Sequence, residues 1–207
     1  MHRRDIERRL QEVAGFEDPR IDLEQYPTPA DVAAHLVHLA AMRGDLDRPV
    51  IDLGTGTGVL ALGAALAGAP AVVGVDRDGA ALATARANAA RLGRAVPFVR
   101  GDATRPPLCP TGPATVLTNP PFGARRGNEG ADRAFLGTAA DLGVVSYSIH
   151  NAGSREFVEA FAADNGGRVT AAFAVELDVD RQFEFHTSER ATVDAEAFRI
   201  GWDAGPG

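Results

Sequence analysis

The stretch VIDLGTGTGVL, residues 50–60, constrains the fold more than any other part of the chain. A short apolar run leads into Gly54, Gly56 and Gly58, and a helix-forming run follows them. Glycines at a strand-to-helix turn let the backbone approach a ligand closely, as in dinucleotide-binding folds. The spacing is G-x-G-x-G, however, and not the G-x-G-x-x-G that presents a helix N-terminus to a pyrophosphate. A tight turn with close helix packing would use the same glycines, so the loop alone leaves the ligand open.

Apolar strands and helical segments alternate along the rest of the chain, with short loops between them. The five strands expected before the last helix lie at 48–53, 71–76, 96–102, 114–121 and 143–150. This alternation predicts an α/β fold with a mostly parallel, doubly wound, Rossmann-like sheet. Pro97 suits an edge strand, because proline cannot donate to a sheet ladder. The last two strands, at 168–180 and 190–200, have no helix between them and predict a C-terminal antiparallel hairpin.

The N-terminal part is expected to be an extension of that core. Apolar residues at helical spacing predict an amphipathic helix over 3–13, and a proline-punctuated loop follows it. Thr28 is expected to cap the next helix, with Pro29 at the first helical position. A chain of 207 residues then forms one domain, with the N-terminal helix and loop at 1–28 and the Rossmann-like core at 29–207.

Acidic residues at the strand ends indicate which ligand the glycine loop takes. Asp76 closes the second strand, where a carboxylate can accept from a ribose diol. Asp102 closes the third strand and is placed to meet an adenine amino group, and Asp52 could meet a cationic amine. Such carboxylates repel a pyrophosphate and favour a sulfonium nucleoside with an ammonium group. S-adenosylmethionine is therefore the expected cofactor, with NAD and a ligand-free fold as the alternatives.

The fourth strand ends in the sequence Asn119-Pro120-Pro121-Phe122, at the edge of the sheet where the cofactor is expected. An exocyclic amine on adenine is a poor nucleophile, because its lone pair is delocalised into the ring. The Asn119 side-chain carbonyl and the Pro120 backbone carbonyl can each accept one N–H, which frees the lone pair to face a methyl group in line. Phe122 can stack on the flat base. A proline-terminated strand with a core phenylalanine is the structural alternative.

Several motifs together resemble one family. DLGTGTGVL, GVD and TNPPFG are similar to class I methyltransferases that act on planar amide or amine nitrogens. LEQYPT at 23–28, NPPFG…G.D..FL at 119–136, YSIH at 147–150 and FEFH at 183–186 are more specific. With the N-terminal ERRLQEVAGFEDP, they resemble the METTL5-type small-subunit rRNA adenine-N6 methyltransferases and their archaeal relatives. The resemblance covers nearly the whole chain.

This resemblance implies a seven-stranded methyltransferase sheet and N6-methylation of adenosine in small-subunit ribosomal RNA. It also implies a heterodimer with a small zinc-binding activator protein that pairs onto a sheet edge. The implied catalytic residues are Asn119, Pro120, Pro121 and Phe122. The cofactor-binding residues that it implies come from four places. Gln25 and Thr28 would cover the cofactor from the N-terminal side, and the loop residues are Gly54, Gly56, Thr57 and Val59. Asp76 would bind the ribose, and Asp102 with Ala103 would bind the adenine.

Charge and cysteine content limit the partners. The net charge is −7, and all 21 basic residues are arginine, which suits a salty cytoplasm. Acidity disfavours nucleic acid in general, so an RNA site must be local and built from arginine. The single cysteine, Cys109, excludes an internal disulfide and a cysteine-based zinc site in this chain. No signal peptide or membrane-spanning run is present, so a cytoplasmic location is expected.

Some residues and two rival functions stay open at this level. Arg125 and Arg126 are candidates for RNA phosphate contacts or for a plain solvated loop. His150 and His186 lack metal-ligand spacing, so a structural or substrate-lining role is favoured and no metal is expected. Phe183 and Phe185 suit either a hairpin core or RNA stacking. The rival functions are a protein-glutamine N5 methyltransferase of the release-factor type and a non-catalytic rRNA-binding assembly factor.

Overall fold

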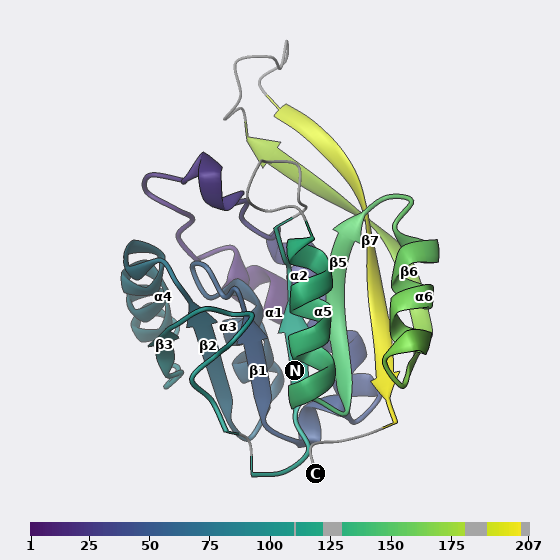
Figure 1. Cartoon of the computed structure of the whole chain (residues 1–207). Helices are drawn as coiled ribbons and strands as arrows, with labels where there is room; N and C mark the ends of the chain where they lie inside the picture. The colour runs from purple at the N-terminus through teal and green to yellow at the C-terminus, as the bar shows by residue number, and fades with distance from the viewer. Residues whose placement is uncertain (110, 122–129, 181–189, 204–207) are drawn as a thin grey trace.

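The computed structural model describes residues 1–109, 111–121, 130–180 and 190–203 (Figure 1). Its centre is a seven-stranded sheet in the order β3-β2-β1-β4-β5-β7-β6. The strands are β1 (Val50–Leu53), β2 (Val72–Asp76), β3 (Phe98–Arg100), β4 (Thr115–Thr118), β5 (Val145–Asn151), β6 (Gly167–Asp180) and β7 (Arg190–Trp202). The predicted doubly wound α/β class is confirmed, and β3 does lie at an edge.

Strands β1 to β5 pair in parallel, whereas β7 is antiparallel to both β5 and β6. The predicted C-terminal hairpin is therefore confirmed, with β7 inserted between β5 and β6 in the sheet order. The strand order reverses between β1 and β4, and a doubly wound sheet binds ligands at the carboxyl ends of the strands beside such a point. Strands β6 and β7 run on together beyond the end of β5, as a two-stranded arm at this same edge (Figure 1).

Helices cover both faces of the sheet (Figure 1). One apolar cluster joins the first four helices to the sheet, and two others pack α5 and α6 against the opposite face. The helices are α1 (Arg3–Leu10), α2 (Ala30–Met42), α3 (Val59–Ala67), α4 (Gly79–Arg91), α5 (Ala131–Leu142) and α6 (Arg155–Asp164), with short 3₁₀ turns η1 (Ile21–Leu23) and η2 (Asp45–Asp47). In the described part of the chain, no helix is both long and apolar enough to cross a membrane.

A buried polar network fixes the hairpin to the core. Arg199 of β7 donates to the carboxylate of Asp45 at 2.8 and 3.0 Å, and the Tyr147 hydroxyl of β5 donates to it at 2.7 Å. Burial opposes ionisation of Asp45, yet these bonds hold its pKa below the usual value. The same carboxylate therefore joins η2, β5 and β7, which sets the hairpin's position in the sheet.

Two local predictions at the N-terminus are wrong. Helix α1 ends at Leu10, short of the expected end at residue 13. Helix α2 begins at Ala30, its N-cap is Pro29, and no side chain caps it. Thr28 is therefore not a cap, because its hydroxyl instead bonds to the side chain of Asn119, which follows β4.

Candidate active site

The glycine loop lies between two aromatic rings. Gly54 and Gly56 have φ angles of 70° and 52°, a region that residues with side chains rarely adopt. A Cβ on Gly54 would lie 3.0 Å from a ring carbon of Phe135, and one on Gly56 would lie 2.9 Å from a ring carbon of Phe16. Phe16 belongs to the N-terminal segment and Phe135 to α5, so segments far apart in sequence close on the loop. Neither ring was identified as a site residue from the sequence.

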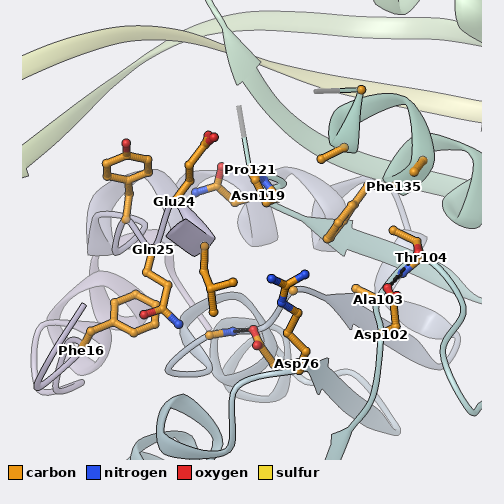
Figure 2. A pocket seen from close by; sticks show the side chains of 18 residues that line it. Phe16, Glu24, Gln25, Asp76, Asp102, Ala103, Thr104, Asn119, Pro121 and Phe135 are labelled. Carbon is orange, nitrogen blue, oxygen red and sulfur yellow. Dashed lines mark hydrogen bonds between the residues drawn. The ribbon is translucent and has the colours of Figure 1, made fainter. Parts of the chain in front are cut away.

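A cavity of about 320 Å³ opens beside this loop (Figure 2). Its wall combines the N-terminal segment, the ends of β2, β3 and β4, and the start of α5. The predicted site residues that line it are Gln25, Gly54, Gly56, Asp76, Asp102, Ala103, Asn119 and Pro121. The sheet edge thus brings together residues spread over nearly a hundred positions, at the place where the strand order reverses.

Other predicted site residues lie in the glycine loop or beside Asn119. Thr57 and Val59 are buried, and the Thr57 carbonyl accepts from Asn88 at 3.0 Å. Pro120 is buried in the turn that follows β4, and Thr28 lies beside Asn119. These residues are not among the described residues that line the cavity. Phe122, Arg125, Arg126, Phe183, Phe185 and His186 lie outside the described residues.

The carboxylate of Asp76 holds the loop in shape. One of its oxygens accepts from the Gly56 amide at 2.8 Å and the other accepts from the Asp78 amide at 2.9 Å. Burial raises the pKa of Asp76, and the two amides oppose that shift. Each oxygen can accept a further bond, so the group can also receive hydroxyl donors from the cavity.

Asp102 is better solvated than Asp76. Its Oδ1 accepts from the amide of Thr104 at 2.8 Å and from the hydroxyl of Thr104 at 2.7 Å. These bonds lower its pKa, so it is a carboxylate at neutral pH. Among the described residues its other oxygen has no hydrogen-bond partner, so it can accept a hydrogen bond from an amino group.

Asp52 serves the loop and not the cavity. It is 1% exposed and does not line the cavity. Its Oδ2 accepts from the Thr55 hydroxyl at 2.6 Å and from the Ala61 amide at 3.0 Å, while Oδ1 is buried without a partner. Burial raises the pKa of Asp52 to about 7. The sequence-based suggestion that it meets a cationic amine does not fit this position.

Two amide side chains hold the N-terminal segment over the cavity. Gln25 donates to Asp78 at 2.6 Å and accepts from the Arg20 amide at 2.8 Å. Asn88 of α4 is fully buried, and it accepts from the amide of Ala14 at 2.9 Å and donates to the Ala14 carbonyl at 3.0 Å. A lone asparagine in a helix gives no sequence signal for such a role.

Asn119, which follows β4, is hydrogen-bonded less completely than Gln25 and Asn88. Its Nδ2 donates to the Thr28 hydroxyl oxygen at 3.0 Å. Its Oδ1 is buried and has no hydrogen-bond partner among the residues that the structure describes. A buried carbonyl oxygen without a donor costs free energy, and such an atom beside a cavity is placed to accept from a ligand.

No metal site is found among the residues that the structure describes. His150 is 2% exposed and packs edge-on against Phe198, with 5.8 Å between the ring centroids. Burial lowers the pKa of His150 to about 4, so the imidazole is neutral near pH 7. Its buried position agrees with the structural one of the two roles expected for it, structural or substrate-lining.

Comparisons with known proteins give the family of this fold. Residues 29–142 match the family described as methyltransferase small domain. The rRNA N6-adenosine methyltransferase Mettl5 of Drosophila melanogaster is 34% identical over 95% of both chains. The METTL5 enzyme of Danio rerio is 32% identical over 97% of this chain and 99% of its own. A candidate RNA methyltransferase structure from Pyrococcus horikoshii superposes with a TM-score of 0.88 at 33% identity, covering 98% of both chains.

Proposed function

This chain belongs to the methyltransferase small-domain family, among the METTL5-type rRNA N6-adenosine methyltransferases, and we propose that it methylates N6 of an adenosine in small-subunit ribosomal RNA. The match to both animal enzymes spans almost the full length of each chain, which supports the same reaction here. The small-subunit target goes beyond what those relatives' names state, and it rests on the sequence resemblance.

S-adenosylmethionine is the expected cofactor, and the residues around the cavity fit it. The cavity volume of about 320 Å³ falls in the range of small-ligand sites. Asp76 would accept from the ribose hydroxyls and Asp102 from the adenine amino group, with Ala103 beside the ring and Gln25 in the covering segment. Thr57 and Val59 would support the glycine loop from behind. When bound, the cofactor supplies a methyl group on a positively charged sulfur.

The observation that carries the proposed chemistry is the unpartnered Oδ1 of Asn119. The amino group of adenine has two N–H donors and a delocalised lone pair. If Asn119 Oδ1 accepts one N–H and the Pro120 carbonyl accepts the other, the nitrogen moves toward tetrahedral geometry and its lone pair becomes available. The residues thus need no base before transfer, because the proton can leave afterwards. Pro121 fixes the turn, and Phe122 would stack on the base.

We also propose an activator partner for this chain. The sequence resemblance implies a small zinc-binding protein that adds to a sheet edge as a heterodimer. The three-residue strand β3 ends the sheet on one side, and its outer backbone groups have no neighbouring strand in the described part of the chain. A partner strand would satisfy them, as edge strands commonly allow.

Mapping N6-methyladenosine in ribosomal RNA from cells with and without this protein tests the proposed function. We expect one small-subunit adenosine to lose its N6-methyl group when the gene is deleted, and to regain it when the gene is restored. An unchanged ribosomal RNA map would contradict the proposal. If a methylglutamine disappeared from a protein instead, the site would serve the release-factor type of reaction, because a glutamine amide meets the same two acceptors.

A further inference from the structure

Thr28 makes a contact that neither helix capping nor the cofactor cavity explains. It lies two residues before α2, which begins at Ala30 and has Pro29 as its N-cap without a side-chain cap. It is not among the described residues that line the cavity. Its hydroxyl oxygen instead accepts from Nδ2 of Asn119, at 3.0 Å and 91 positions away in the chain.

In the observed contact the Thr28 hydroxyl accepts from Nδ2, so the amide oxygen of Asn119 faces away from Thr28. An amide side chain is planar, with a donor nitrogen on one side and an acceptor oxygen on the other. With Nδ2 bonded to Thr28, Oδ1 is the amide atom left over, and within the described ranges this buried oxygen has no hydrogen-bond partner. In the flipped orientation the nitrogen would take its place, and an amino-group substrate would then meet a donor where it needs an acceptor.

The surroundings of Asn119 supply few other restraints on the amide. In the described part of the chain, the bond to Thr28 is the only hydrogen bond that this side chain makes. Asn119 follows β4 directly, so its backbone is fixed by the sheet and by the two prolines after it. Rotation about the last side-chain torsion is the freedom that remains, because such torsions are broad and nearly two-fold.

We propose that Thr28 is a positioning residue that orients the catalytic amide of Asn119, so that Oδ1 faces the amino group to be methylated. The inference rests on the proposed function for the identity of that amino group. It assigns Thr28 to the catalytic step, whereas the sequence resemblance assigns it to covering the cofactor. The two roles predict different kinetic changes.

Replacing Thr28 by valine keeps the side-chain shape and removes the acceptor. We expect Thr28→Val to lower kcat about tenfold, the effect of losing one modest hydrogen bond, with the Kd for S-adenosylmethionine unchanged within about twofold. Thr28→Ser restores the hydroxyl and should recover most of kcat. Thr84→Val is the matched control, since among the described residues the Thr84 hydroxyl bonds only a carbonyl of its own helix, that of Ala80 at 3.4 Å. It should change neither constant.

A double-mutant cycle with Asn119→Asp distinguishes a loss of amide orientation from a general loss of packing. Asn119→Asp replaces the amide by a carboxylate, whose two oxygens are equivalent, so no wrong orientation exists. In that background Thr28→Val should cost less than about threefold in kcat, because there is nothing left to orient. An equal loss in both backgrounds, wild-type kcat in Thr28→Val, or a loss of cofactor affinity that accounts for the lost activity would each overturn the proposal.

A structural readout keeps the test independent of the substrate. The side-chain NH₂ signals of Asn119 can be assigned by NMR, because Asn119→Asp removes them. In the wild-type chain Thr28 should slow exchange of these protons with solvent, and Thr28→Val should shift the signals and speed their exchange several-fold. Unaltered signals would contradict the contact. A chain inactive on ribosomal RNA that still shows these shifts would instead refute the proposed function and leave the Thr28 contact in place.

Discussion

Two asparagines, Asn88 and Asn119, differ in how completely their side-chain amides are hydrogen-bonded. Asn88 is fully buried in α4 and uses both ends of its amide, accepting from Ala14 and donating to the carbonyls of Ala14 and Thr57. Asn119 uses its nitrogen on Thr28 and leaves its oxygen buried without a partner. The satisfied amide ties the N-terminal segment to the glycine loop, and the incomplete one lies at the cavity.

The comparison shows that a buried polar atom without a hydrogen-bond partner indicates a binding site only where a cavity lies beside it. Asp52 also carries a buried oxygen without a partner, yet it does not line the cavity, and its cost is seen as a raised pKa. An orphaned buried atom therefore indicates a site only when a ligand can reach it. Asn119 meets both conditions, since it lines the cavity and its oxygen is free.

Removing the Asn119 amide should have the largest effect. Asn119→Ala deletes the oxygen that we propose accepts from the reacting amine, so we expect methyl transfer to fall by about 100- to 1,000-fold. The Kd for S-adenosylmethionine should stay within about twofold, and the free energy of unfolding within about 1 kcal/mol. Single-turnover kinetics, calorimetry and urea unfolding measure the three quantities. Turnover near the wild-type rate would show that Oδ1 is not the acceptor.

Removing the satisfied amide should instead cost stability. Asn88→Leu fills a similar volume but leaves the Ala14 and Thr57 groups without partners, so the free energy of unfolding should fall by about 3 kcal/mol. Urea unfolding measures this change. Asn165→Ala is the control, because Asn165 is exposed and its side chain, within the described part of the chain, bonds only the nearby Phe161 carbonyl. This variant should cost less than about 1 kcal/mol. An equal loss of unfolding free energy in Asn88→Leu and Asn165→Ala would show that the Asn88 amide has no special structural role.

Asp76 lies between the two extremes, since its oxygens hold the loop and also line the cavity. We expect Asp76→Ala to raise the Kd for S-adenosylmethionine about 10- to 100-fold, because a carboxylate is a strong acceptor for ribose hydroxyls. Isothermal titration calorimetry measures the Kd. Asp141→Ala, on an exposed part of α5, is the matched control. An unchanged affinity in Asp76→Ala would show that the ribose binds elsewhere.

The smallest effect concerns Asp52 and depends on pH. Burial raises its pKa from 3.8 to about 7, so the folded chain keeps a proton that the unfolded chain loses between those values. The stability of the wild-type chain should therefore fall as pH rises from about 4 to 7, through this group. Asn cannot ionise, so Asp52→Asn should gain about 2 kcal/mol relative to wild type between pH 5 and pH 8. Urea unfolding at both pH values checks this, and a pH-independent difference would refute the assigned burial cost.

Sequence patterns predicted the core of this fold well. Alternating apolar strands and helices led to the doubly wound sheet, because the pattern reflects burial on both faces. The hairpin followed from the absence of a helix between the last two strands. The end of α1 was placed three residues too late. The contact of Thr28 was also missed, because a threonine before a proline is typical of a helix cap in the local sequence. Its actual partner, Asn119, is 91 positions away.

The candidate site was predictable where a residue's place in a strand determines its direction. Gly54, Asp76, Asp102 and Asn119 each follow or end a parallel strand, and parallel strands bring their carboxyl ends to one edge. Phe16, Asn88 and Phe135 were not predictable in this way. Their contacts depend on how the N-terminal segment and two helices fold over the loop, and that is a matter of tertiary packing.

The most direct test of the central claim is to identify the methylated product. The protein is isolated from its native cells, so that any bound activator remains, and is incubated with unmethylated small-subunit ribosomal RNA and S-adenosylmethionine. The RNA is then digested to nucleosides for mass spectrometry. We predict N6-methyladenosine at about one per RNA molecule, and almost none with Asn119→Ala. A methyl group on a different nucleoside, no methylation at all, or full activity of Asn119→Ala would contradict the account.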